Sequence, residues 1–308
     1  MSPTETRPFP LVPQRRFSGV RSGYNRSPRR GQGDDVAGMR PYRPGDRRAW
    51  IDWRASARLS AARGVDEFVV REFVAAVAPR VAIVVDRRPR MMLVGQPFPW
   101  LDKPAAVDGA IRSISRATLA EGGDLAYVEQ RDGRALWLPP GPPALVLERR
   151  SRDGTEAVLD TEPYALDRCV DQLASHASIL PAGAFVFVLS DFVEAASPRT
   201  WARLRALRWD VTPVVVQDPM WEQSFPDVGG TLLSLYDAVT GVASDVVLTG
   251  REARARAAVN EHRLEELLRG FARLGFDPIV LGSSEPAMIA TAFHSWAARR
   301  KRLRRRSA

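Results

Sequence analysis

Three short apolar runs constrain the fold of this chain more than any other feature. Residues 81–86 read VAIVVD, residues 185–192 read FVFVLSDF, and residues 211–218 read VTPVVVQD. Continuous apolar runs of this length are typical of parallel strands that are buried on both faces of a sheet. Helical patterns lie between and after these runs, over residues 104–120, 162–177, 198–207 and 251–274. Because strands that alternate with helices form βαβ units, we predict an α/β fold with a mainly parallel sheet and helices on both faces.

Weaker signals complete the expected secondary structure. Segments 125–130 and 134–139 flank Arg131-Asp132-Gly133, and the Asp-Gly pair predicts a hairpin between them. The PPGPP run at 139–143 predicts a rigid connector, because proline donates no sheet hydrogen bond. A final helix is expected to start near Pro286 and to end before the basic run at 299–306. We also expect strands at 145–149, 231–241 and 277–282, and a strand, or a strand turning into a short helix, at 65–74.

The basic character of the chain is concentrated at its two ends. The 308 residues carry a formal net charge of +9. Residues 1–33 contribute +6 and residues 299–308 contribute +7, which leaves the body between them at −4. A nucleic-acid-binding domain more often carries positive charge on its folded surface, so the distribution favours basic tails on a slightly acidic body. Residues 1–35 are rich in Pro, Arg, Ser and Gly, and we expect them to be disordered.

Several classes of protein and of site are disfavoured by the sequence. No run of 18 or more uncharged apolar residues is present, so no transmembrane helix is expected. The first residues lack the pattern of a secretory signal, which favours a cytoplasmic protein. Cys169 is the single cysteine and the three histidines are scattered, so neither a disulfide nor a zinc site is expected. No GxxxxGK[ST] phosphate loop occurs, and we expect no cofactor.

The densest unusual chemistry lies in residues 40–58, which read RPYRPGDRRAWIDWRASAR. Six arginines surround Asp46 and Asp52, and Trp50 and Trp53 flank the second carboxylate. Guanidinium groups bind carboxylates through two hydrogen bonds, so the pattern predicts an Arg–carboxylate network clamped by tryptophan. We favour a structural knot that holds an N-terminal extension against the core; the alternative is an anion site or a catalytic pair of carboxylates. No histidine or cysteine lies nearby to act as base or nucleophile.

This segment resembles a bacterial family, domain of unknown function 58 (DUF58), a set of von Willebrand factor A-like proteins. The similarity rests on R-P-Y-R-P-G-D, then I-D-W-R-A-S-A-R, then V-R-E-F at 70–73 and a strand that ends in Asp86. The motif residues are Arg40, Tyr42, Pro44, Gly45, Asp46, Ile51, Asp52, Trp53, Arg54 and Arg58. The resemblance implies a doubly wound, von Willebrand factor A-like domain over 81–298, followed by a basic tail over 299–308. It also implies a motif with accessory strands over 36–80, and a MoxR-type AAA+ ATPase as partner.

The resemblance further implies a metal crevice at the strand ends, and the chain departs from the family pattern there. Intact domains of this kind carry Asp-x-Ser-x-Ser after the first core strand and a second aspartate after a later strand. Asp86 and Asp191 are kept, but both serine positions are arginine, Arg88 and Arg90. Because two hydroxyl ligands are lost and two positive charges are added, we expect a degenerate site that holds no metal. Either an arginine folds back onto Asp86 and Asp191, or the arginines point to solvent while the aspartates bond backbone groups.

We expect a non-enzymatic protein-interaction module that binds its partner at a rim outside the carboxyl ends of the strands. Loops 86–92, 191–194 and 218–225 would form this rim, with Met91, Phe192, Met220 and Trp221 as contact residues. An alternative is binding to anionic membranes or nucleic acid through the arginine-rich tails. A third possibility, an enzyme that uses Asp46 and Asp52, has no visible set of supporting groups.

Overall fold

The structure, a computed structural model, describes residues 7–14, 36–73, 78–92, 101–131, 134–153, 164–194, 196–236 and 242–306. The chain divides into two compact units. The larger unit is formed by Met1–Val20 and Pro79–Ala308, and the smaller one by Arg21–Ala78.

The larger unit is built on a six-stranded sheet with the order β10-β7-β6-β3-β4-β5. Its strands are β3 (Arg80–Val85), β4 (Asp124–Arg131), β5 (Arg134–Gly141), β6 (Phe185–Ser190), β7 (Asp210–Val216) and β10 (Ile279–Leu281). Neighbouring strands are parallel except β5, which pairs antiparallel with β4. The predicted doubly wound α/β fold is therefore confirmed, as is the pairing of the two hairpin strands. The turn residues Asp132 and Gly133 lie outside the described residues.

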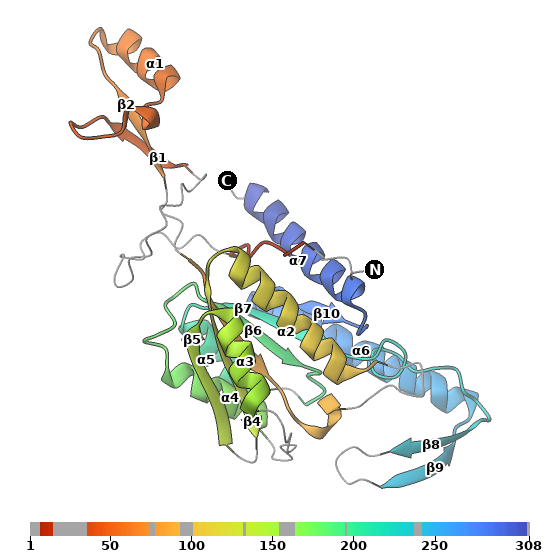
Figure 1. The fold of residues 1–308 in the computed structure, drawn as a ribbon. Helices are drawn as coiled ribbons and strands as arrows, with labels where there is room; N and C mark the ends of the chain where they lie inside the picture. The colour runs from red at the N-terminus through yellow and green to blue at the C-terminus, as the bar shows by residue number, and fades with distance from the viewer. Residues whose placement is uncertain are drawn as a thin grey trace, which may run out of the picture. The chain divides into compact units, whose positions relative to one another are not determined.

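Helices cover both faces of this sheet (Figure 1). One face packs against α2 (Lys103–Ala120), α3 (Pro143–Asp153) and α7 (Pro286–Arg306). The other face packs against α4 (Ala165–Ser175), α5 (Pro198–Ala206) and α6 (Gly250–Leu274). Within β3, Val81, Ile83 and Val85 belong to the first core, and Ala82 and Val84 belong to the second. All five side chains are fully buried, which explains the continuous apolar run in the sequence.

An N-terminal segment packs into the first core. Phe9, Leu11 and Val12 are buried, and the ring of Phe9 stacks on Phe293 of α7 with a centroid distance of 4.7 Å. The amide of Leu11 donates to the carboxylate of Glu121 over 2.7 Å. The prediction of disorder over residues 1–35 is therefore wrong for residues 7–14, because a few apolar side chains between prolines suffice to tie a terminus to a folded body.

The basic C-terminal run also belongs to the folded unit. α7 extends to Arg306, so the predicted end of the last helix before residue 299 is wrong. Arg300 is buried, and its guanidinium donates to Asp210 (2.8 Å), to Thr212 (3.1 Å) and to the carbonyl of Val12 (3.1 Å). The ring of Trp296 lies 4.3 Å from the same guanidinium. One tail arginine thus joins α7, β7 and the N-terminal segment.

Two predicted strands are placed differently. Residues 145–149 lie within α3, because Pro143 starts a helix where its missing N–H leaves no hydrogen bond unmade. Residues 232–236 form β8, which pairs antiparallel with β9 (Ala243–Val247) in a separate two-stranded sheet and is not a strand of the core. The first residues of the PPGPP run end β5, an edge strand where proline is tolerated.

The smaller unit pairs β1 (Val36–Pro41) with β2 (Val69–Phe73) in an antiparallel ladder. A short 3-10 turn (Arg48–Trp50) and α1 (Trp53–Arg63) connect the two strands. β2 confirms the strand expected within residues 65–74. Across both units, none of the described helices is long and apolar enough to cross a membrane.

Candidate functional site

The strand order of the core sheet reverses between β3 and β6. From β3 the chain continues to β4 on one side, and it returns with β6 on the other side. Asp86 follows β3 and Asp191 follows β6, and both side chains are buried. The amide of Asp86 donates to the carbonyl of Leu189 on β6 over 2.9 Å. Ligands of open α/β sheets bind at such a reversal, outside the carboxyl ends of the strands.

Arg88 folds back onto Asp86. Its Nη2 and Nε atoms lie 2.6 Å and 3.0 Å from the carboxylate oxygens of Asp86. Its Nη1 atom donates to Glu194, on the loop after β6, over 2.6 Å. The hydroxyl of Ser190 donates to the same Asp86 carboxylate over 2.6 Å. Of the two alternatives for the arginines, Arg88 therefore follows the first: it folds back and pairs with Asp86. Both carboxylate oxygens of Asp86 accept hydrogen bonds.

Asp191 is bonded to a lysine that the sequence analysis did not identify. Lys103 begins α2 and is only 1% exposed. Its Nζ atom lies 3.1 Å from Asp191 and 2.6 Å from Glu222. Arg90 stands farther away, at 3.5 Å from Asp191 and 3.7 Å from Glu222. The ammonium group of Lys103 is therefore the closest cation to this pair of carboxylates, and Arg90 adds a weaker ion pair.

The ion pairs shift the pKa values of two groups in the cluster, Asp191 and Arg88. Burial alone would favour the protonated form of Asp191, but the positive charge of Lys103 holds the pKa of this carboxyl below its usual value. Burial also disfavours the charged guanidinium of Arg88, yet its hydrogen bonds to Asp86 raise the pKa of Arg88 above its usual value. Both shifts favour the charged form, of Asp191 and of Arg88 respectively.

The residues present do not fit a divalent metal ion. Magnesium requires hard oxygen ligands in octahedral geometry. Here the carboxylates of Asp86 and Asp191 are already bonded to a guanidinium and to an ammonium group. A metal ion would have to displace cations that repel it. Over the described part of the chain, no group of three or more His, Cys, Asp and Glu side chains is placed to hold a metal ion.

Two of the four residues expected at the interaction rim are buried. Met91 is 2% exposed and Phe192 is 3% exposed, and the ring of Phe192 packs against Trp201 and Phe271. The prediction that these two residues contact a partner is therefore wrong, because both belong to the hydrophobic core. Met220, in contrast, is 58% exposed, and Trp221 is half-buried with its ring edge-on to Phe225.

The loop of residues 218–225 is held in one conformation. The carboxylate of Asp218 accepts from the amides of Met220 and Trp221, both over 2.8 Å, and from the amide of Leu101 over 2.6 Å. Asn260 of α6 donates to the carbonyl of Trp221 over 3.2 Å and to that of Ser224 over 2.6 Å. Met220 is therefore presented to solvent by a fixed backbone.

In the smaller unit, Asp46 closes a turn. Arg40 forks onto its carboxylate with two hydrogen bonds of 2.7 Å, and the amide of Arg43 adds a third of 2.8 Å. These bonds, that of Arg40 above all, lower the pKa of Asp46 to about 2. Gly45 has a φ of 104°, a conformation that residues with a Cβ atom rarely adopt. Tyr42 and Pro44 complete the turn region, and the amide of Tyr42 donates to the carbonyl of Phe68 over 2.8 Å.

Asp52 has a separate structural role. It caps α1 by accepting from the amides of Arg54 and Ala55, and it pairs with Arg71 of β2 at 2.8 Å. The expected single network is therefore two independent ion pairs. Trp53 is 62% exposed, so it is not the expected clamp. Ile51 forms a β-bridge with Val70, while Arg54 and Arg58 are exposed. The motif therefore holds the smaller unit together, and the expected attachment of an N-terminal extension to the core stays a prediction.

The sequence analysis missed Lys103, Glu194 and Glu222. The hydrogen bonds of Lys103 join residues that lie 88 and 119 positions apart in the chain, so no local pattern reveals them. One signal was available: Lys103 and Lys301 are the two lysines among 45 basic Lys and Arg residues. A lysine at the start of a helix is conspicuous in such an arginine-rich chain.

Comparisons with other proteins complete the description. BatB from Bacteroides thetaiotaomicron is 16% identical with a TM-score of 0.38, over 72% of this chain and 99% of that one. An aerotolerance-related membrane protein from Bacteroides fragilis NCTC 9343 is 16% identical with a TM-score of 0.41, over 72% and 99% of the two chains. The pilus adhesin SpaC from Lactobacillus rhamnosus GG is 10% identical with a TM-score of 0.40, over 73% of this chain and 31% of that one. A comparison with curated proteins finds no match. Residues 38–266 match the family described as "Protein of unknown function DUF58", and the chain belongs to that family.

Proposed function

We propose that this protein is a non-enzymatic, von Willebrand factor A-like interaction module whose metal site is degenerate and replaced by cations of the chain itself. The observation that carries the proposal is the seating of Arg88 on Asp86 and of Lys103 on Asp191 at the switch point of the sheet. A metal ion in such a crevice would bind the carboxylates and hold the surrounding loops. In our proposal, the guanidinium of Arg88 and the ammonium group of Lys103 bind these carboxylates instead, so that the surrounding loops are held without a metal ion.

The 218–225 loop is the surface that we assign to partner binding. Met220 offers an exposed apolar side chain on a backbone that is already fixed by Asp218 and Asn260. A preformed loop loses little conformational freedom when a partner binds, which favours affinity. Methionine also adapts its shape to an apolar partner surface.

We propose a MoxR-type AAA+ ATPase as the partner, in the assembly or remodelling of other proteins. The support is the family resemblance; the lack of a GxxxxGK[ST] phosphate loop in the given sequence fits a dependence on a partner for energy. Because such an ATPase works on cytoplasmic nucleotide, we propose a cytoplasmic location for the module.

The test is the affinity of the full chain for the MoxR-type ATPase of the same organism, measured by biolayer interferometry. Met220→Glu should weaken binding about tenfold or more, because it places a charge in an apolar contact. Leu119→Glu is the matched control, since Leu119 is 62% exposed and lies at the far end of α2. Equal affinities of the two variants and the native chain would exclude the 218–225 loop as the contact.

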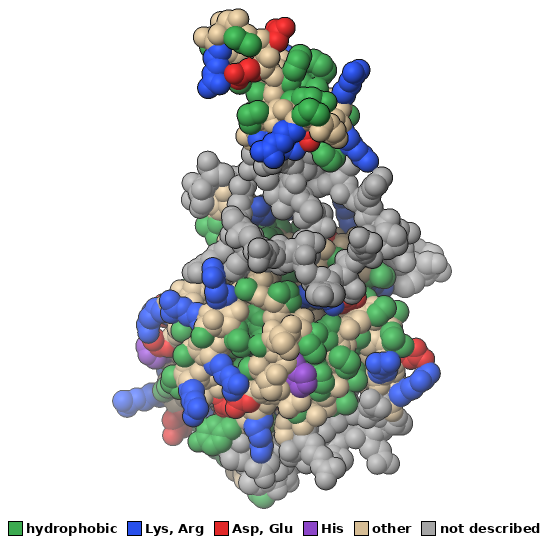
Figure 2. Space-filling view, turned by 90° about the vertical axis from the view of Figure 1, so that its left-hand side faces the viewer, with side chains coloured by type: hydrophobic (Ala, Val, Ile, Leu, Met, Phe, Trp, Pro, Cys, Tyr) green, Lys and Arg blue, Asp and Glu red, His purple; other side chains and the backbone are tan. Residues whose placement is uncertain are grey.

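The alternative is binding of anionic membranes or nucleic acid through the arginine tails. Two arginines of the C-terminal tail are already paired with carboxylates of the larger unit. Arg300 is buried against Asp210, and Arg299 pairs with Asp277 at 3.1 Å. In Figure 2 the Lys and Arg side chains of the larger unit are scattered among hydrophobic and acidic ones on the face in view. Tight, steeply salt-dependent binding to double-stranded DNA or to anionic vesicles would favour this alternative, if it is lost when the arginines within residues 15–33 are replaced by glutamine and residues 301–308 are removed.

A further inference from the structure

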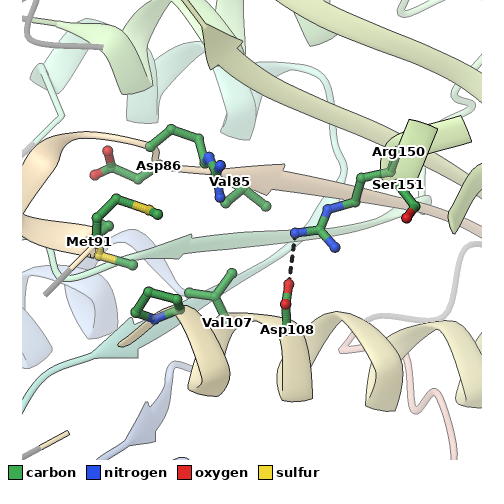
Figure 3. A pocket seen from close by; sticks show the side chains of 10 residues that line it. Val85, Asp86, Met91, Val107, Asp108, Arg150 and Ser151 are labelled. Atoms are coloured by element: carbon green, nitrogen blue, oxygen red, sulfur yellow. Dashed lines mark hydrogen bonds and ion pairs between the residues drawn. The ribbon is translucent and has the colours of Figure 1, made fainter. Parts of the chain in front are cut away.

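A cavity lies beside the candidate site, at the carboxyl end of β3 (Figure 3). Its volume is about 290 Å³. The loop after β3, the first turns of α2 and the last turns of α3 form its walls. The cavity adjoins the ion pairs of the candidate site, because Asp86 belongs to its wall and Pro104 of the wall follows Lys103 in α2.

The acidic groups on the cavity wall are already neutralised. Asp108 accepts from Nη2 of Arg150 over 2.7 Å, as Figure 3 shows. Asp86 is paired with Arg88 at 2.6 Å. Arg150 is held in place, because its Nε atom donates to the hydroxyl of Tyr127 over 3.0 Å and its guanidinium lies over that ring. The two wall carboxylates therefore do not leave a net negative charge in the cavity.

Arg87 supplies a guanidinium whose donors are less completely used. Its nearest carboxylate, Glu129, lies 3.7 Å away, beyond hydrogen-bond distance, and also accepts from the hydroxyl of Tyr127 over 2.5 Å. The Nε atom of Arg87 is buried and has no hydrogen-bond partner among the described residues. The buried Nε atom faces Glu129, so a ligand in the cavity would meet Arg87 at its Nη atoms, where the side chain lines the cavity.

Apolar side chains also line the cavity, although most of its exposed lining is polar. Val85, Met91, Pro104 and Val107 line it, and Ser151 adds one hydroxyl. The space is that of a small ligand, at the lower end of the range for ligand pockets, about 300–1,000 Å³. Arg87 is ion-paired with Glu129 through its Nε side, which leaves its Nη donors for a single negative charge; a dianion such as phosphate would face the nearby carboxylates of Asp86 and Asp108. A carboxylate also matches the planar fork of arginine.

We propose that this cavity binds a monocarboxylate that carries a small apolar group, with Arg87 on the carboxylate and Met91, Pro104 and Val107 around the apolar group. This chemistry has two sources: a free carboxylic acid of amino-acid size, or the C-terminal residue of a polypeptide. The inference does not depend on the proposed function, because the cavity and the 218–225 loop are different surfaces.

The test uses isothermal titration of the full chain with N-acetyl-leucine and with its neutral amide, N-acetyl-leucinamide. The acid should bind at least about tenfold more tightly than the amide, because a charged hydrogen bond is lost with the carboxylate. Arg87→Met should abolish this preference. Ser151→Ala, at an exposed position that leaves the fold intact, should reduce affinity for the acid severalfold and keeps the test valid if Arg87→Met unfolds.

The source of the carboxylate is tested with the peptide acetyl-Ala-Ala-Ala-Leu, as free acid and as C-terminal amide. Binding of the peptide acid at least as tight as that of N-acetyl-leucine supports a polypeptide C-terminus, whereas exclusion of the peptide supports a free small acid. Equal binding of acid and amide, or no binding of any of the four compounds, would overturn the proposal. An unchanged preference for the acid in Arg87→Met would overturn it as well.

Discussion

Replacement of Lys103 by methionine tests the strength of the cation cluster. The side chains have similar length, so Lys103→Met removes the ammonium group and keeps most of the packing. Asp191 and Glu222 then lose their bonds of 3.1 Å and 2.6 Å while they stay buried. Removing one partner of a buried ion pair costs about 3–5 kcal/mol. We expect the lower end, about 3 kcal/mol, because Arg90 remains 3.5 Å from Asp191.

The loss is read as the free energy of unfolding in urea, followed by circular dichroism. In a thermal scan it corresponds to a fall in Tm of about 6–12 °C, since each kcal/mol lowers Tm by about 2–4 °C in a domain of this size. Lys301→Met is the matched control, because Lys301 is exposed near the end of α7, and we expect a change within about 0.5 kcal/mol. A Lys103→Met variant as stable as this control would refute the claim that the ammonium group holds the two carboxylates.

Two further perturbations probe the N-terminal segment and the smaller unit. Phe9→Ala should lower the free energy of unfolding of the larger unit by about 3–5 kcal/mol in urea, because removal of the buried ring leaves a cavity beside Phe293 and Trp296. Arg7→Ala is the control. A loss no larger than that of the control would show that the N-terminal segment is not part of the core. The carboxyl of Asp46 should titrate near pH 2 by carbon-detected NMR, below its usual pKa of 3.8. Because the pKa is lowered in the folded state, the Arg40 pair contributes stability above about pH 4 and loses it as the pH falls towards 2. Arg40→Gln should raise the titration midpoint towards 3.8, and an unchanged midpoint would contradict the assignment.

The core strands could be predicted from the sequence because strands buried on both faces consist almost entirely of apolar residues. β3, β6 and β7 are buried on both faces, so each appears as an unbroken apolar run. The proximity of Asp86 and Asp191 could also be predicted from the sequence, since the carboxyl ends of neighbouring parallel strands meet at one edge of the sheet. The pairing of Arg88 with Asp86 was one of two expectations, and the short spacing makes it possible within one loop.

The rest depended on contacts between distant parts of the chain. Lys103 meets Glu222 only because α2 and the loop after β7 converge at the same edge. Phe9 and Leu11 lie among prolines and arginines, a composition typical of disorder, and only the surface offered by α7 makes them core residues. Met91 and Phe192 were misplaced for the opposite reason: an apolar residue in a loop can turn inward, and the sequence does not show its direction.

The most direct test of the central claim is a thermal-shift titration of the native chain with magnesium, manganese and calcium against an EDTA control. A metal that binds the folded state raises Tm by mass action. The account predicts no shift for the native chain, because Arg88 and Lys103 already occupy the carboxylates of Asp86 and Asp191. An Arg88→Ser/Arg90→Ser variant serves as the comparison, since it restores two hydroxyl ligands. A metal-dependent rise in the Tm of the native chain that is lost in Asp86→Ala would contradict the account.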